Sequence, residues 1–530
     1  MDRSAPVIPT QAAGTAPPGS PGVARVIHAL EVVRDLVTRL DRAGIRFCQF
    51  KSNRHLNEGV GGITDLDVLV ERSAGPMLSV VLGQSGFKRF SAPPGGDYPA
   101  VEDYLGMDTA TGRLVHLHLH HRLTTGVPHL KGHRIPWEEL VLTTRLRDED
   151  SGFWVSEPNV ELLFLLARGA LKVGLSDRLA AWWGQDRVRA GLMPEYLWLR
   201  ERIQLPRVIE LGGSLLGADV GPALESILST GPSLGRLLAL RRRATPVLRR
   251  YRTHGPAGAL LERWRRQLQS LRSKIGRRFR RVAGPVSRID PRGGIIIAFM
   301  GPDGAGKSRL TSEVALWLNW KLDARVIYFG SGDGPSSLVR RPLKIVLALA
   351  RGLKLWPKTG GRSDVTDERG PSAGHRGPST IRGLALACWA LALAFEKRHK
   401  LERAWRARNS GIVVVCDRYP QNQIMGFNDG PLLSHWDRSR SGLLRALARW
   451  ESTPYRWAED DAPDLIVKLH VSPAVAVRRK AEMLPEEIQK RSRALARLCY
   501  PAGTRVVDLD ADRPWDDVLL DAKREVWGGL

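Results

Sequence analysis

The sequence predicts an α/β protein made of two globular domains. A chain of 530 residues exceeds what one hydrophobic core usually organises, and a hydrophobic content of 43% is enough for two cores. Three unbroken apolar runs in the C-terminal half begin near Ile295, Gly411 and Pro463. Such runs are typical of parallel strands that helices cover on both faces. The N-terminal half combines strand patterns with later leucine-rich helices, which predicts an α+β domain with a helical extension.

Shifts in composition give the expected domain boundaries. Residues 1–22 form a tail rich in Pro, Ala and Gly that we expect to be disordered. The first domain with its helical extension is expected over 23–235, and 160–173 is one of its predicted helices. A basic helical linker over 236–292 then leads to the second domain over 293–530.

The most informative segment is 295–308, which reads Ile-Ile-Ile-Ala-Phe-Met-Gly-Pro-Asp-Gly-Ala-Gly-Lys-Ser. An apolar strand pattern is followed by a complete G-x-x-x-x-G-K-S loop and then by a helical pattern. Such a loop can curl so that its backbone N–H groups point at phosphate oxygens. Lys307 is expected to reach the β and γ phosphates, and the Ser308 hydroxyl is expected to bind Mg²⁺. The expected nucleotide contacts are Gly301, Asp303, Gly304, Ala305, Gly306, Lys307 and Ser308. The segment therefore predicts binding of a nucleoside triphosphate.

An acidic residue follows the second apolar run, as a phosphate loop requires on a neighbouring strand. Asp417 stands where the buried strand in 411–420 ends, and ligands bind outside the carboxyl ends of such strands. We expect Asp417 to face the metal ion, directly or through water. Arg418 is expected to hold an acceptor phosphate in a bidentate fork, the alternative being a structural salt bridge.

The third run, 463–471, leads into a basic region. Ser472 is a plausible helix N-cap with Pro473 at the first helical position. The stretch 478–493 is a helix-loop-helix candidate that could close over the phosphates, and Arg479 is our candidate for a catalytic lid arginine. A solvated helix face is the alternative interpretation. The basic residues of this stretch are Arg478, Arg479, Lys480, Lys490, Arg491 and Arg493.

Together these motifs resemble the thymidylate kinase family of nucleoside monophosphate kinases, over 293–530. The resemblance implies a five-stranded parallel sheet flanked by helices and transfer of the ATP γ-phosphoryl group to a nucleoside monophosphate. By the same resemblance Lys307 and Ser308 contact phosphate and magnesium. Asp417 is implied as the acid on the metal side, and Arg418 as the ligand of the acceptor phosphate.

The sequence departs from that family in the acceptor region. The usual Thr-Arg-Glu-Pro-Gly stretch is absent after the first helix, where 328–334 and a long insert over about 335–382 stand instead. Arg309 replaces the usual threonine. The phosphate loop has Ala305 at a position where an arginine could act in catalysis. A catalytic arginine is therefore expected from the lid stretch 478–493. The acceptor is therefore left open among nucleotides, nucleosides and sugars.

The N-terminal half carries a separate carboxylate pair. Asp65 and Asp67 share one face of a predicted strand, which is how two carboxylates can hold magnesium for nucleotidyl transfer. With Ser52 upstream, the segment 23–123 resembles the minimal nucleotidyltransferase superfamily, although Lys51 stands where its glycine is usual. The resemblance implies Asp65 and Asp67 as metal ligands.

Histidines stand where that superfamily has a third carboxylate. His116, His118 and His120 alternate along a predicted strand and share one face. They could bind zinc, supply a base beside Asp65 and Asp67, or form a polar sheet face. The half could also be a module that binds the substrate or product of the other half.

The segment 236–281 is strongly basic. It contains sixteen Lys or Arg residues against Glu262 alone, so a net +15 of the chain's +26 resides there. Apolar residues recur at helical spacing among the arginines: Leu260, Leu261, Trp264, Leu268, Leu271 and Ile275. The pattern suits a solvated helix between domains or a helix lying on an anionic membrane. Nucleic acid is disfavoured because no zinc-finger or RNA-recognition signature accompanies the patch.

Two hypotheses on function follow. The first is an enzyme, an ATP- and Mg-dependent kinase fused to a nucleotidyltransferase-like domain. The second is a nucleotide-dependent switch or scaffold at a membrane surface without kinase activity. The N-terminus lacks a secretory signal pattern, the apolar run 384–395 is too short to span a bilayer, and the four cysteines are scattered, which together predict a cytoplasmic protein. The oligomeric state is left open, a dimer included.

Overall fold

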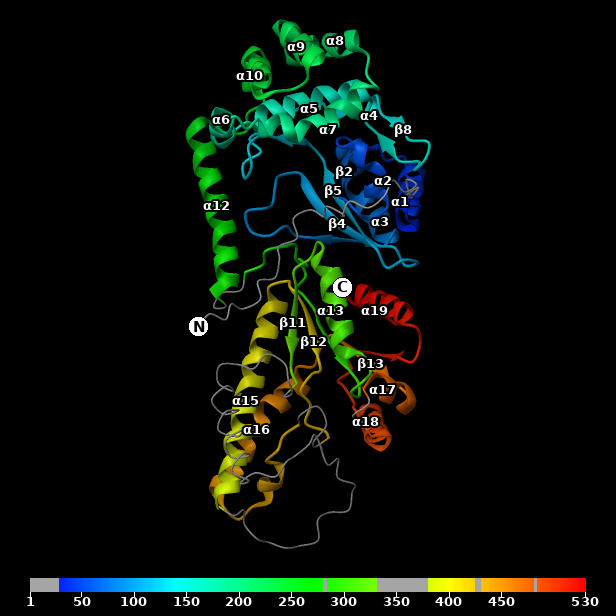
Figure 1. Cartoon of the computed structure of the whole chain (residues 1–530), viewed down its shortest axis with the longest axis vertical. Helices are drawn as coiled ribbons and strands as arrows, with labels where there is room; N and C mark the ends of the chain where they lie inside the picture. Colours follow the sequence, from blue (N-terminus) through cyan, green and yellow to red (C-terminus); the bar gives the residue numbers. More distant parts are fainter. Residues whose placement is uncertain (1–27, 280–283, 331–379, 425–429, 481–483) are drawn as a thin grey trace.

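Figure 1 shows the computed structural model of the chain, in which two α/β parts follow one another along the long axis. The described residues are 28–279, 284–330, 380–424, 430–480 and 484–530. The predicted N-terminal tail and most of the predicted insert lie outside these ranges.

The second part is built on a parallel five-stranded sheet, as predicted. Its strands are β10 (Ile296–Met300), β11 (Ala324–Tyr328), β12 (Val413–Asp417), β13 (Leu465–His470) and β14 (Arg505–Asp510). They are ordered β11-β12-β10-β13-β14, and every neighbouring pair is parallel. The strands β10 and β12 are therefore neighbours, so the residues that follow them meet at one edge of the sheet.

Helices cover both faces of this sheet, which explains its unbroken apolar runs. Alternate residues of β10 fall into two buried clusters: Ile297 and Phe299 pack with α13 (Lys307–Asn319) and α19 (Trp515–Gly529), while Ile296 and Ala298 pack on the opposite face. The helices that complete this part are α15 (Thr380–Asn409), α16 (Gly442–Asp460), α17 (Pro473–Arg479) and α18 (Pro485–Arg497).

The first part contains a mixed seven-stranded sheet in the order β3-β4-β5-β2-β1-β9-β8. Its strands are β1 (Phe47–Gln49), β2 (Leu66–Val70), β3 (Phe87–Phe90), β4 (Val101–Met107), β5 (Leu114–His120), β8 (Leu146–Arg147) and β9 (Trp154–Val155). A hairpin of β6 (Leu123–Thr125) and β7 (His133–Ile135) and the helices α1 (Glu31–Arg42), α2 (Leu56–Val60), α3 (Gly75–Gln84) and α4 (Glu138–Thr143) accompany it. The strands β2 and β5 are parallel, and Asp67 pairs with His118 in their register.

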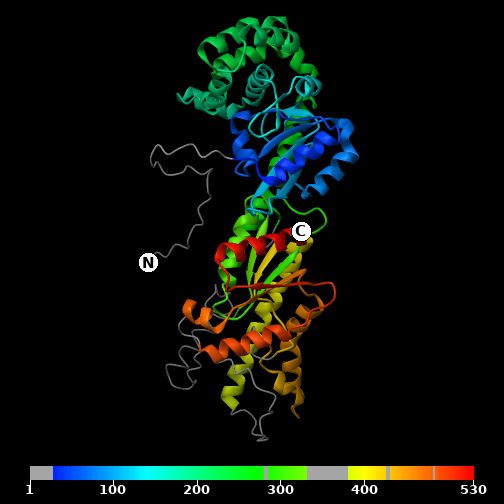
Figure 2. The same cartoon turned by 90° about the vertical axis from the view of Figure 1, so that its right-hand side faces the viewer.

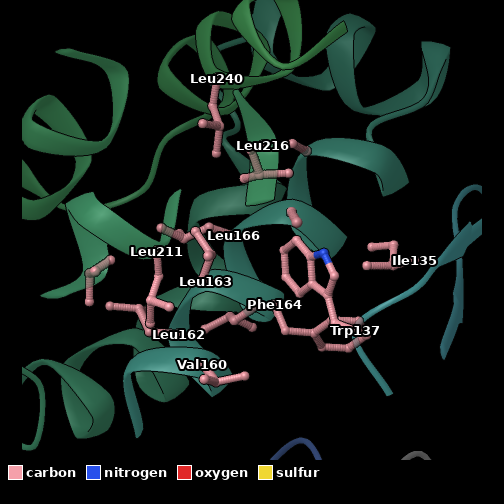
Figure 3. Packing of buried hydrophobic residues seen from close by; sticks show 14 of the residues in the cluster. Ile135, Trp137, Val160, Leu162, Leu163, Phe164, Leu166, Leu211, Leu216 and Leu240 are labelled. Carbon is pink, nitrogen blue, oxygen red and sulfur yellow. The ribbon is translucent and has the colours of Figure 1, made fainter. Parts of the chain in front are cut away.

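A helical extension follows this sheet, as predicted. It consists of α5 (Pro158–Lys172), α6 (Leu175–Trp182), α7 (Arg187–Arg200), α8 (Leu205–Leu216), α9 (Gly221–Thr230), α10 (Leu234–Arg243) and α11 (Thr245–Arg250). Figure 3 shows part of its core, in which Trp137 and Phe164 lie among leucines of several helices. The residues Leu237, Leu240 and Leu248 are buried in the same core. The first part of the expected linker therefore belongs to the helical extension, because its apolar face packs there.

Most of the remaining basic residues of 236–281 lie in the long helix α12 (Pro256–Phe279), which runs from the helical extension toward the second part in Figure 1. Its Arg266 is buried and donates to the carbonyl oxygen of Asp97, which fastens the helix to the first part. Among the described residues, no helix is long and apolar enough to cross a membrane.

The two parts share a hydrophobic core. Phe90, Leu105 and Leu114 of the mixed sheet belong to the buried cluster that includes the apolar face of α13 and α19. The indole N–H of Trp317 on α13 donates to the carbonyl oxygen of Gly112 at 2.8 Å. The close approach of α13 and α19 to β4 is visible in Figures 1 and 2. The helix that begins at the predicted phosphate loop thus also packs against the first part.

Candidate functional site

The loop of residues 301–308, called the phosphate loop below, joins β10 to α13. Gly304 and Gly306 adopt φ of 86° and 87°, a left-handed conformation that glycine adopts without strain. A Cβ on Gly304 would lie 3.1 Å from the carbonyl oxygen of Ala476 on α17, and one on Gly301 would lie 2.9 Å from that of Leu469. The loop is therefore held tightly by β13 and α17 and ends at the N-terminus of α13, where a phosphate is favoured.

Lys307 is the first residue of α13 and is only 5% exposed. Its Nζ donates to the carbonyl oxygen of Pro302 at 2.7 Å and lies 3.7 Å from the Asp303 carboxylate. Burial lowers the pKa of Lys307 to about 8, and the neighbouring positive charge of Arg418 adds to the effect. A buried ammonium group is thus placed where a phosphate would neutralise it.

Asp303 of the phosphate loop gathers cations from distant segments. The guanidinium of Arg418 donates to its Oδ1 at 2.6 Å, and Arg491 of α18 donates to its Oδ2. Burial alone would raise the pKa of Asp303, but the charges of Arg418, Lys307 and Arg491 lower it to about 2. Arg418 adopts φ of 67°, which turns the chain sharply after β12.

The arginine-rich stretch supplies a contact to the loop, but not through the arginine that the sequence suggested. Arg479 is the last residue of α17, and its guanidinium donates to the carbonyl oxygen of Ala511 at 2.9 Å. Arg491, one helix later, is the one that reaches Asp303. Helical spacing alone could not separate the two, because their directions depend on how α17 and α18 pack. Ser472 is an N-cap as predicted, since its hydroxyl accepts from the N–H of Val475.

Ser308 and Asp417 lie together, as β10 and β12 are neighbours. The Ser308 hydroxyl donates to Asp417 Oδ2, while the buried Asp417 Oδ1 makes no hydrogen bond. A hydroxyl and a carboxylate with an oxygen to spare are the hard oxygen ligands that Mg²⁺ prefers. These two residues therefore fit a magnesium ion held beside the phosphate loop.

A second polar cluster lies in the mixed sheet and is called the Asp/His cluster below. Its members are three carboxylates and three histidines. Asp65 directly precedes β2, Asp67 lies on β2, Asp103 lies on β4, and His116, His118 and His120 lie on β5. His116 bridges two carboxylates, with Nδ1 2.9 Å from Asp65 Oδ1 and Nε2 2.9 Å from Asp103 Oδ1. The structure therefore places the histidines beside Asp65 and Asp67.

Each carboxylate of this cluster has a cationic neighbour. Lys51 Nζ lies 2.8 Å from Asp67 Oδ1, and the Arg288 guanidinium donates to Asp103 Oδ1 at 2.7 Å. Lys321, two residues beyond the end of α13, contacts Asp65. A third carboxylate of the cluster, Asp103, comes from β4, and the sequence pattern did not indicate it. Arg288 and Lys321 were also missed, because nothing local to them indicates a contact with the other half of the chain.

Burial and charge set the protonation of this cluster. Burial would raise the pKa of Asp103, but hydrogen bonds from His116 and His118 and the charge of Arg288 bring it well below its usual range. Burial lowers the pKa of His120 to about 4 despite Asp67. For His118 burial is outweighed by Asp103 and Asp67, so the pKa is raised. The cluster therefore contains a neutral, deeply buried imidazole at neutral pH.

The parallel sheet, the loop of residues 301–308 and the helix that follows define the second part as a phosphate-loop α/β domain. No family model matches the chain. The chain is similar to two Escherichia coli K12 proteins described as uncharacterized ATP-binding proteins. It is 28% identical to YghR over 234 residues, which is 44% of this chain and 86% of YghR. It is 25% identical to YghS over 236 residues, which is 44% of this chain and 93% of YghS.

Proposed function

We propose that the protein is an ATP- and Mg²⁺-dependent phosphotransferase of the thymidylate kinase type, acting from the phosphate loop. The observation that carries the proposal is the meeting of Lys307, Arg418 and Arg491 at Asp303, beside the Ser308 and Asp417 pair. Phosphoryl transfer depends mainly on positioning and on stabilising charge, and these groups supply both. The similarity to proteins named as ATP-binding supports ATP as the nucleotide.

The proposed roles follow from where each side chain lies. The loop N–H groups and the N-terminus of α13 hold the phosphates of ATP, and Lys307 exchanges the Pro302 carbonyl for them. Ser308 and Asp417 hold Mg²⁺, which shares the phosphate charge when bound. Arg491 stabilises charge on the group being transferred, a role that the sequence assigned to Arg479.

For the acceptor we propose a nucleoside monophosphate, held through its phosphate by Arg418. This arginine follows β12 directly, so it projects from the same sheet edge as the phosphate loop. A guanidinium fork matches a phosphate group and neutralises charge that would repel the attacking oxygen. An arginine at this place could also stabilise charge during hydrolysis, so a modified acceptor is the result that separates transfer from the switch hypothesis.

A mass-spectrometric acceptor scan tests this function. The full-length protein is incubated with ATP and Mg²⁺ against pools of nucleoside monophosphates, nucleosides and sugars. The expected result is conversion of a monophosphate to its diphosphate. A phosphorylated nucleoside or sugar would keep the kinase but overturn the acceptor, and ADP release with no modified acceptor would favour the switch.

We also propose that α12 contacts an anionic membrane surface. Its apolar residues form an exposed row, with side chains 49–73% exposed at Leu260, Leu261, Trp264, Leu268 and Leu271. Arginines flank the row, and such a helix binds acidic lipids through charge and buried apolar area. Leu261→Glu is expected to weaken sedimentation with phosphatidylserine vesicles, while the exposed Leu443→Glu on α16 leaves it unchanged. Equal binding to neutral phosphatidylcholine vesicles would contradict the proposal.

For the first part we propose a role other than the magnesium-dependent nucleotidyl transfer that its resemblance implies. Asp65 and Asp67 each contact a lysine and at least one imidazole through Oδ1. Magnesium prefers oxygen ligands and keeps several waters, which this arrangement of lysine and histidine does not favour. We therefore propose no nucleotidyl transfer for this part.

A further inference from the structure

Three side chains of the Asp/His cluster converge in the manner of metal ligands. Asp67 lies on β2 and His118 and His120 lie on the parallel neighbour β5, with all three side chains on one face of the sheet. One ligand atom from each lies within 4.8 Å of the others. We propose that Asp67 Oδ1, His118 Nδ1 and His120 Nε2 bind a divalent transition metal of the zinc class.

The separations suit a metal ion better than hydrogen bonds. Asp67 Oδ1 lies 3.5 Å from His118 Nδ1 and 3.5 Å from His120 Nε2. A tetrahedral zinc ion with bonds of about 2.1 Å separates its ligand atoms by about 3.4 Å. A hydrogen bond between nitrogen and oxygen is shorter, at about 2.9 Å. The separations of Asp67 Oδ1 from both histidine nitrogens therefore match those between the ligands of one zinc ion.

His120 is the observation that demands a partner. Its side chain is 2% exposed, and neither ring nitrogen makes a hydrogen bond. An unsatisfied buried polar group costs about 1–3 kcal/mol, so such groups are rare in folded proteins. Phe50 packs against the ring edge at 4.9 Å between centroids and offers no polar atom. Protonating His118 would satisfy that residue and would leave both nitrogens of His120 as they are, whereas a metal ion would also bind His120 Nε2 and leave only Nδ1 of that ring without a partner.

His118 is oriented as a metal ligand by a carboxylate behind it. Its Nε2 lies 2.9 Å from Asp103 Oδ1, on the side of the ring away from Asp67. An Arg288 guanidinium N–H also lies 3.1 Å from this Nε2, while Arg288 Nε–H already donates to Asp103 Oδ1. Metal binding at Nδ1 would place the ring proton on Nε2, so that Nε2–H donates to Asp103 in place of the Arg288 contact and the lone pair on Nδ1 faces Asp67 Oδ1. A ligand histidine commonly donates its other nitrogen to a carboxylate in this way, which fixes its tautomer. Asp103 is therefore a positioning residue rather than a ligand.

The donor set selects the metal class and excludes a neighbouring site. Two imidazoles and one carboxylate suit zinc and related ions, whereas Mg²⁺ prefers oxygen alone. The adjacent trio of Asp103, His116 and His118 has spacings of 2.9 Å between its nitrogen and oxygen atoms, which are hydrogen-bond distances. The Lys51 ammonium group contacts Asp67 Oδ1, the oxygen proposed to bind the metal, so it competes with the ion.

Metal titration of the full-length protein, first stripped with a chelator, tests the site. Zinc affinity is measured by competition with a chromogenic chelator, and cobalt(II) substitution reports tetrahedral nitrogen and oxygen coordination by its visible absorption. His120→Asn and His118→Asn are expected to weaken zinc binding at least tenfold, and Asp103→Asn about tenfold. Lys51→Met is expected to strengthen binding, because it removes the competing cation.

His121→Asn is the matched control. His121 directly follows the strand and, unlike His120, is outside the ligand cluster, so its replacement should leave zinc affinity unchanged. Circular dichroism of each metal-free variant separates loss of ligands from loss of fold. Because Lys51→Met removes no ligand, its tighter binding tests the site even if a histidine variant fails to fold. Equal zinc affinity in the wild type and His120→Asn, weaker binding in Lys51→Met, or loss of binding in His121→Asn would overturn the proposal.

Discussion

The phosphate loop and the Asp/His cluster are both buried groups of acids and bases, yet they are built in opposite ways. In the phosphate loop one carboxylate, Asp303, is contacted by three cations. In the Asp/His cluster each of the three carboxylates contacts a cation, and the cations are Lys51, Arg288 and Lys321. The ring nitrogens of His120 make no hydrogen bond. The first arrangement is suited to receive an anion, and the second to receive a metal cation.

The difference also lies in how each group depends on chain connectivity. Most of the phosphate-loop site comes from eight consecutive residues, so its geometry follows from the loop itself. The Asp/His cluster requires β2, β4 and β5 to pair correctly and α13 to dock against the sheet. Changes to the loop should therefore affect catalysis and leave the fold intact, while changes to the cluster should affect how the two parts are held together.

The largest expected effect is that of Lys307→Ala. Removing this phosphate contact should lower phosphoryl transfer by at least about 10²-fold, since a buried charge aimed at the transferring group is lost. The loop conformation should persist, because it depends on Gly301, Gly304 and Gly306. Steady-state kinetics and a thermal melt measure the two effects. Arg505→Ala, which removes an exposed charge on β14, is the matched control, and undiminished turnover in Lys307→Ala would refute the phosphate-loop assignment.

Arg418 and Arg491 should differ from one another in kinetics although both contact Asp303. Arg418→Ala is expected to raise the acceptor KM about tenfold or more, and Arg491→Ala to lower kcat by about 10²-fold. Arg418→Lys keeps the charge but loses the fork, so it should recover only part of the affinity. If both alanine variants changed the KM for ATP alone, the assignment of Arg418 to the acceptor would be wrong.

The sequence predicted most of what is local and little of what crosses the fold. The parallel sheet and the Ser472 cap were predicted correctly, because strand, loop and cap chemistry act over a few residues. The sequence named Arg479 as the lid candidate, and the structure places Arg491 rather than Arg479 against Asp303, because both have the same local pattern and only the packing of α17 and α18 separates their contacts. Asp103, Arg288 and Lys321 could not be found from local patterns, because their contacts depend on strand pairing and on docking of the two parts.

The contact between Lys321 and Asp65 should measure how strongly the Asp/His cluster joins the two parts. A double-mutant cycle of Lys321→Met and Asp65→Asn is expected to give a coupling of about 1–2 kcal/mol in the free energy of unfolding. The partial exposure of both side chains keeps this below the value of a fully buried pair. Urea unfolding followed by tryptophan fluorescence supplies the four free energies. Strict additivity would show that this ion pair does not contribute to the docking of the two parts.

The smallest expected effect is a proton taken up when ATP binds. Burial holds the pKa of Lys307 at about 8 in the free protein, so this side chain is partly neutral at about pH 8.5. Bound phosphates favour the charged form and raise that pKa, so binding should take up a fraction of a proton, and ATP affinity should fall as the pH rises from 8 toward 10. Calorimetry at about pH 8.5 in two buffers of different ionisation enthalpy measures the uptake. Lys307→Arg, which stays charged, should abolish it. Equal proton uptake in that variant would place the titrating group elsewhere. The phosphate loop would then lack the feature that most clearly separates it from the Asp/His cluster, which is a buried cation whose protonation responds to a bound anion.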